Sequence, residues 1–169
     1  MNFLDLFPTI DLFILFLFVG AIFFNGTFVK KEKLFIDLLG LYTAFLFVVV
    51  VPVFSPQVVE WFGLHPYVRL LAFLVLKFGL LFILWHSNLG SFSKKIAPTE
   101  MSTSVVYRIG LMGLFFSTII YFLPESIGVY FGTMTNFLFG NLIAMLFWFV
   151  LPLFFAFAYR FKTRRGWIE

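Results

Sequence analysis

Residues 34–54 of this 169-residue chain read LFIDLLGLYTAFLFVVVVPVF, and within them residues 44–51 are apolar at every position. A strand of a transmembrane barrel would instead alternate polar and apolar residues over about 10 positions. A continuous apolar stretch of about 20 residues is the length that an α-helix needs to cross the hydrocarbon core of a bilayer. This segment therefore predicts a membrane-spanning helix.

Four further apolar segments flank it, separated by proline, glycine and clustered charges. The composition agrees with a membrane protein, because 62% of the residues are hydrophobic and 12% are charged, against about 45–50% and 25% in soluble domains. We therefore expect an all-α integral membrane protein of five helices, forming a single polytopic domain over residues 1–169 in a plasma or inner membrane. The predicted spans are residues 9–29, 34–54, 66–86, 104–124 and 136–159.

The basic residues are concentrated in alternate connections between the spans. The first connection holds Lys30, Lys31 and Lys33, the third holds Lys94 and Lys95, and the C-terminus carries four more. Because cytoplasmic loops carry the excess of Lys and Arg, this pattern predicts an N-out, C-in topology. The same five lysines are the expected contacts with anionic lipid or a partner. The net charge of +4 therefore indicates a membrane boundary rather than nucleic acid.

Two connections have recognisable character. Residues 56–64 (PQVVEWFGL) mix apolar and polar side chains and predict a short helix lying in the membrane interface. Residues 87–103 form the longest polar stretch and contain glycine, proline and two lysines, as is typical of a loop. This loop is the expected contact for a soluble partner.

Ionisable residues within spans are costly and are candidates for function. Arg108 lies about one turn from a cytoplasmic span end, where a long side chain can reach lipid phosphates. Asp11 and Asp37 lie near the starts of the first two spans, where a carboxylate can support a helix start. Lys77 is different, because it lies roughly 14 to 16 Å deep, near the middle of its span.

A charged lysine at that depth requires a partner or a special role. Counted from the middle of each span, Asp37 and Asp11 are about 10 to 12 Å away from Lys77 along the membrane normal. Lys77 is therefore expected to be satisfied either by another subunit or by hydroxyl groups at a similar depth, namely Thr43, Ser117 and Thr118. The alternative is a proton- or ion-coupling site, in which Lys77 acts with one of the two carboxylates.

The fourth span carries a stripe of small residues at spacings of three and four: Gly110, Gly113 and Ser117. Such a stripe lets another helix approach closely, so helix packing is its expected role. In the fifth span, Asn141 and Pro152 could line a cavity, but hydrogen bonding between helices is the expected role of the amide.

Enzyme chemistry is not expected. The HExxH, GxSxG, GxGxxG and Walker patterns are absent from the sequence, which also contains no cysteine. His65 and His86 bracket the third span about 31 Å apart along one helix, too far to share a haem. We therefore predict no catalytic residue, no metal site and no cofactor.

The first two spans show an Asp at the head of span one, a glycine and lysine turn, and a second span rich in Leu and Gly. The residues concerned are 9–14 (TIDLFI), Gly20, Ala21, Gly26, Lys30, Lys31 and 34–40 (LFIDLLG). This pattern resembles the opening of the colicin V production protein family. Residues 107–113 (YRIGLMG) are similar to the start of a later span in that family. The resemblance covers about the first 125 residues and implies an inner-membrane protein linked to export and envelope integrity, with no catalytic residue to transfer.

Three functions stay open at this stage. The first is a non-enzymatic scaffold or accessory subunit, which packs with itself as a homo-oligomer or with other membrane subunits through its small-residue faces. The second is a small transporter or channel component that uses Lys77. The third is a structural subunit of a larger membrane complex. In all three the lipid bilayer is the shared partner, and no nucleic acid is involved.

Overall fold

The computed structural model describes residues 9–65, 67–89, 93, 98 and 101–164, and within these residues it is helical, with no strand. The all-α prediction is therefore confirmed for this part of the chain. The long helices are α1 (Thr9–Phe28), α2 (Leu34–Phe54), α4 (Val68–Trp85), α6 (Met101–Phe122) and α9 (Leu142–Arg164). The short ones are η2 (Lys31–Lys33), α3 (Pro56–Leu64), α7 (Glu125–Gly128), α8 (Thr133–Thr135) and η3 (Asn136–Gly140), of which η3 is a π-helix.

Four of the described helices are individually long and apolar enough to cross a membrane: α1, α2 (together with η2), α4 and α6. Residues 133–140 and α9 are long and apolar enough when taken together. The described helices therefore provide five candidate spans if this bent pair is one span. These helices are compatible with a membrane protein. Residues 56–64 form the short helix α3, as the sequence predicts.

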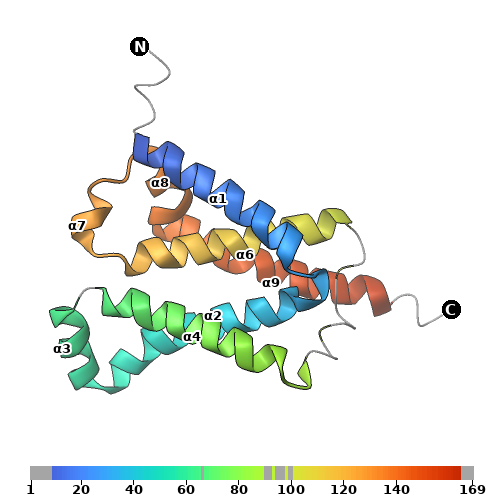
Figure 1. Ribbon diagram of the computed structural model, residues 1–169, viewed down its shortest axis with the longest axis horizontal. Helices are drawn as coiled ribbons and strands as arrows, with labels where there is room; N and C mark the ends of the chain where they lie inside the picture. The colour runs from blue at the N-terminus through green and yellow to red at the C-terminus, as the bar shows by residue number, and fades with distance from the viewer. Residues whose placement is uncertain (1–8, 66, 90–92, 94–97, 99–100, 165–169) are drawn as a thin grey trace, which may run out of the picture.

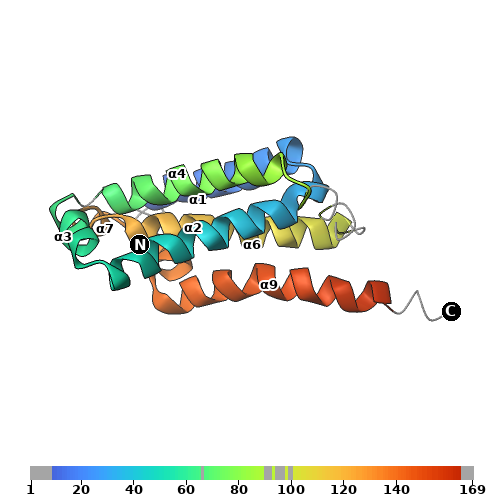
Figure 2. The same ribbon diagram turned by 90° about the horizontal axis from the view of Figure 1, so that it is seen from below.

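The helices form a layered bundle (Figures 1 and 2). Figure 2 shows α2 and α6 in the middle, with α1 and α4 on one side and α9 on the other. The helix α2 lies along α4, α6 lies along α9, and α1 packs against α6 and α8. Leu111 and Leu114 of α6 are fully buried, which makes α6 the centre of the core.

Gly40 lies where α2 approaches α4. A Cβ atom at Gly40 would lie 3.8 Å from both the carbonyl oxygen of Lys77 and the amide nitrogen of Leu81. The backbone of α4 therefore lies directly against Gly40, level with the stretch that begins at Lys77. Because residues three apart share a helix face, Asp37 also faces this contact.

The fifth predicted span, residues 136–159, is interrupted near its N-terminal end. The axes of residues 133–140 and 142–156 differ by 46°. Asn141 makes the break, because its amide nitrogen donates to the carbonyls of Asn136 (3.2 Å) and Phe137 (3.1 Å), while its Oδ1 accepts from the amide of Ala144 (2.6 Å). The Asn141 side chain thus bonds to the carbonyls of η3 and caps the start of α9. Pro152, in contrast, lies within the continuous helix α9.

Candidate functional site

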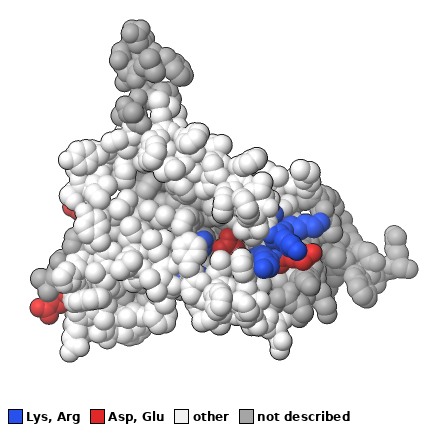
Figure 3. Space-filling view, viewed as in Figure 1, with Lys and Arg blue, Asp and Glu red and all other residues white. Residues whose placement is uncertain are grey.

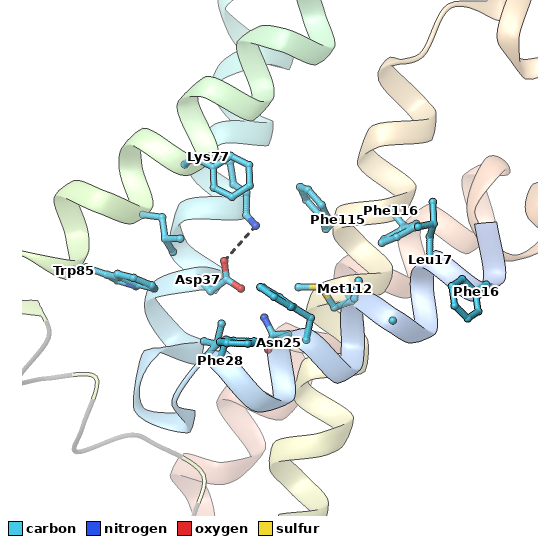
Figure 4. A pocket seen from close by; sticks show the side chains of 16 residues that line it. Phe16, Leu17, Asn25, Phe28, Asp37, Lys77, Trp85, Met112, Phe115 and Phe116 are labelled. Atoms are coloured by element: carbon cyan, nitrogen blue, oxygen red, sulfur yellow. Dashed lines mark ion pairs between the residues drawn. The ribbon is translucent and has the colours of Figure 1, made fainter. Parts of the chain in front are cut away.

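Asp37 of α2 and Lys77 of α4 form a buried ion pair. The Lys77 Nζ atom lies 3.5 Å from Asp37 Oδ1, and each side chain is 7% exposed. Figure 4 shows the two side chains pointing toward each other. The same Nζ atom lies 4.2 Å from the centroid of the Phe115 ring, within the range of a cation–π contact. The lysine charge is therefore held between a carboxylate and an aromatic face.

The expectation that hydroxyl groups satisfy Lys77 is wrong. It assumed that the middles of all spans lie at one level, whereas Gly40 lies against the backbone of α4 at Lys77, one turn from Asp37. The lysine side chain covers the remaining distance. Of the expected hydroxyls, Thr118 donates to the Leu114 carbonyl (2.7 Å), and Thr43 is exposed. The Ser117 hydroxyl is fully buried and has no hydrogen-bond partner in the part of the chain that the structure describes.

The ion pair lines a cavity of about 630 Å³ between α1, α2, α4 and α6. Asn25, Asp37 and Lys77 are its polar lining residues, and the rest of the wall is apolar and mostly aromatic. Figure 3 shows charged atoms in a hollow in the middle of a largely uncharged face. We call the cavity that Asp37 and Lys77 line the ion-pair cavity. A ligand inside it would meet two opposite charges against apolar walls.

Arg108 of α6 is bound to α1. Its Nη1 atom donates to the side-chain oxygen of Asn25 at 2.8 Å and also to the Asn25 backbone carbonyl. Arg108 is 8% exposed and Asn25 is 5% exposed, so the guanidinium is held inside the bundle, where the expectation was a side chain reaching out to lipid. The sequence analysis assigned Asn25 no such role. The signal that could have identified it is an amide inside an otherwise apolar helix.

Asp11 of α1 is fully buried at the other end of the bundle. Its carboxylate accepts hydrogen bonds from the amides of Gly132 (2.9 Å) and Met134 (3.1 Å) and from the hydroxyl of Thr135 (2.6 Å). The sequence suggested that the Asp11 carboxylate supports a helix start. The helix that it supports is α8, however, and not α1, to which Asp11 belongs. Asp11 therefore connects the first and last spans and is distant in sequence from all three donors.

The small-residue stripe lies at the contact between α6 and α9. A Cβ atom at Gly113 would lie 2.1 Å from the ring of Trp148, and one at Gly110 would lie 3.3 Å from Pro152 Cδ. Ser117 continues the stripe and is fully buried. The helix that this stripe accommodates belongs to the same chain, so these residues are not available to pack against a second copy.

The expected lipid-contact lysines are separated by the fold. Lys30 and Lys31 line a second cavity of about 560 Å³ at the end of the bundle. The Lys33 Nζ atom lies 3.7 Å from the centroid of a Trp85 ring. Lys94 and Lys95 lie outside the described residues.

No family model, curated protein or solved structure matches this chain. The resemblance to the colicin V production protein family therefore stays a prediction from the residues quoted above. Across the described residues, His, Asp and Glu side chains form no group of three that could hold a metal ion.

Proposed function

We propose that this chain is a small membrane transport or channel component in which Asp37 and Lys77 handle a proton or a small ion. The observation that carries the proposal is the buried ion pair in the wall of the ion-pair cavity. Ionisable residues inside membrane spans usually mark ion pathways or proton relays, because their insertion is costly.

The geometry of the pair supports a role beyond folding. Transferring each ion out of water costs several kcal/mol, and a buried pair repays this only when further hydrogen bonds satisfy both groups. Among the described residues Asp37 Oδ1 has no hydrogen-bond partner, and its 3.5 Å distance to Lys77 exceeds the roughly 2.7–2.9 Å of a charge-assisted hydrogen bond. A loose, incompletely satisfied pair can exchange its partner for a proton or an ion.

A second cation makes such an exchange less costly. Asp37 also interacts electrostatically with Arg108, which is fixed by Asn25. When Lys77 gives up its proton, the Asp37 charge therefore keeps a compensating cation nearby. The combined charge of Asp37, Lys77 and Arg108 then passes from +1 to zero.

Proton flux across proteoliposomes tests the proposal. A potassium diffusion potential drives protons, and an enclosed pH-sensitive dye reports them. We expect the paired substitution Asp37→Leu/Lys77→Met to reduce the flux at least about tenfold, toward that of empty liposomes, because it removes both charges. The matched control is Glu60→Leu/Arg69→Met, which removes the same two charge types from exposed positions on α3 and α4 and should conduct like the wild type.

Stability measurements keep this test interpretable. The double variant should fold as well as the wild type, since replacing both members of a buried pair by apolar residues is often neutral or stabilising. Lys77→Met alone should lower the free energy of unfolding by about 3 kcal/mol, because it leaves the buried Asp37 without its ion-pair partner. A double variant that is stable and still conducts would assign the pair a purely structural role. A wild type that conducts no better than empty liposomes would exclude proton transport.

The scaffold or accessory-subunit function is the second candidate, with a structural subunit of a larger complex as its variant. It is favoured by the low burial of α1 and α4. In each of these helices 11% of the residues of the apolar segment are buried, against 56% in α6. Those apolar faces could contact further subunits as well as lipid. The mass of the protein in nanodiscs from its own membrane tests this reading, since co-purifying chains would support a partner and a monomer would oppose it.

A further inference from the structure

The second cavity lies at the basic end of the bundle, apart from Asp37 and Lys77. Its walls come from the end of α1, the turn that contains η2, and the first two turns of α6. Six of its lining residues are polar or charged: Thr27, Lys30, Lys31, Glu32, Ser104 and Arg108. We propose that this basic cavity binds a phosphate group, with Arg108, Ser104 and Lys31 as its principal contacts.

The charge of the lining suits an anion. Three cations and one carboxylate give the cavity a formal charge of +2. Lys30 and Lys31 are exposed, so their flexible side chains can close over a ligand without leaving water beforehand. Figure 3 shows Lys, Arg, Asp and Glu atoms grouped at this end of the molecule. A phosphate, which has a charge of about −1 to −2 and several acceptor oxygens, complements such a lining.

Arg108 is held in place before any ligand arrives. Its hydrogen bonds to described residues both use Nη1 and go to Asn25, so among these residues the donors on Nε and Nη2 remain for a ligand. A planar guanidinium binds phosphate through two parallel hydrogen bonds. Because Asn25 fixes the side chain and burial limits its motion, little rotamer freedom remains to be lost on binding.

Ser104 supplies an independent indication. It is 8% exposed and lines the cavity, so it contributes a hydroxyl group to the cavity wall. A hydroxyl can donate a hydrogen bond, and a phosphate oxygen in the cavity can accept it. Ser104 lies four residues before Arg108, on the same face of α6. It also lies in the first turn of a 22-residue helix, where the helix dipole favours an anion.

The phosphate could belong to a lipid headgroup or be a free anion. The cavity lies where candidate spans begin or end, near Phe28, Lys31 and Met101, which is the level of the headgroups in a bilayer. Basic recesses between spans on the cytoplasmic side commonly bind anionic lipid headgroups. The test therefore uses phosphatidylglycerol as the lipid probe and inorganic phosphate as the soluble probe.

Native mass spectrometry of the intact chain, released from micelles doped with phosphatidylglycerol or phosphatidylcholine, measures the binding. The wild type should retain phosphatidylglycerol in preference to phosphatidylcholine. We expect Lys31→Gln/Ser104→Ala to weaken this binding about tenfold, the factor that corresponds to losing one charge-assisted hydrogen bond. The matched control is Lys33→Gln/Ser117→Ala, which changes a lysine of the same turn and a serine of the same helix, neither of which lines the cavity.

Titration with inorganic phosphate identifies the source. If phosphate alone binds and depends on Lys31 and Ser104, the natural ligand is a soluble phosphate; if only the lipid binds with this dependence, the ligand is a headgroup. Either result supports the site. Equal loss in the two double variants would mean general attraction to a basic surface and would overturn the proposal. Equal retention of the two lipids, without phosphate binding, would overturn it as well.

Discussion

Replacing Gly113 by alanine should lower the free energy of unfolding by about 3 kcal/mol, although it adds a single methyl group. The new Cβ atom would lie 2.1 to 2.5 Å from three ring atoms of Trp148, far inside van der Waals contact. The indole cannot move freely, because its Nε1 donates to the Leu138 carbonyl at 2.6 Å and its ring stacks on Phe139. Relieving the clash therefore breaks a hydrogen bond or separates α6 from α9.

The chain offers two internal comparisons for this substitution. Gly79 on α4 is exposed, and a Cβ atom there meets nothing within 4 Å, so Gly79→Ala should change stability by less than about 0.5 kcal/mol. Gly110→Ala should fall between the two, since its Cβ atom would lie 3.3 Å from Pro152 Cδ. Equilibrium unfolding in mixed micelles of a mild detergent and SDS measures all three. A Gly113→Ala variant as stable as Gly79→Ala would contradict the packing of Trp148 on α6.

The helices themselves could be predicted because their signals are local. The end of α2 and the start of α3 illustrate this, since Ser55 adopts an extended conformation and Pro56 occupies the first turn of the next helix. Proline is tolerated at that position and prevents a helix from continuing through it. An apolar run followed by such a break is visible in the sequence without knowledge of any neighbour.

The partners of the buried polar groups could not be predicted in the same way. The ion pair depends on how α2 and α4 are shifted along each other, and this shift places Gly40 against the α4 backbone. The depth of a residue, counted from the ends of its own span, contains no information about this shift between the two helices. Likewise, Asn25 and Arg108 are 83 residues apart in sequence, and nothing local identifies an amide on α1 as the acceptor for a guanidinium on α6.

The small-residue stripe was predictable as a packing surface, but the identity of its partner was not. Glycine at spacings of three and four permits close approach by any helix. The specific partner is decided by Trp148, whose ring fills the space above Gly113. The break at Asn141 is similar, because it depends on one amide that bonds both to the preceding turn and to the Ala144 amide, a choice that helix propensity does not encode.

Replacing Asp11 by alanine should destabilise the end of the bundle that contains α8 by at least about 3 kcal/mol, because two amides and one hydroxyl lose a charged acceptor inside the fold. Two of these donors, Gly132 and Met134, belong to the backbone at the start of α8, and the carboxylate that they lose is fully buried. The first turn of α8 should open while the pairing of α2 with α4, at a different place in the bundle, stays intact. Asp11→Asn should lose part of the same stability, since its NH₂ group would face a donor.

Hydrogen–deuterium exchange separates this local effect from a general loss of charge. Amides of residues 131–137 should exchange faster in Asp11→Ala, whereas those of α2 should be unchanged. Glu125→Ala is the matched control, because it also removes a carboxylate near a helix start, α7, but from an exposed side chain, where the expected change is below about 0.5 kcal/mol. Equal exchange in the two variants would mean that Asp11 does not hold α8. Faster exchange confined to residues 131–137 would establish that the Asp11 carboxylate of α1 holds the segment before the bend in the last predicted span. The α1–α8 connection would then stabilise one part of this bent pair, and the α6–α9 contact would stabilise the other.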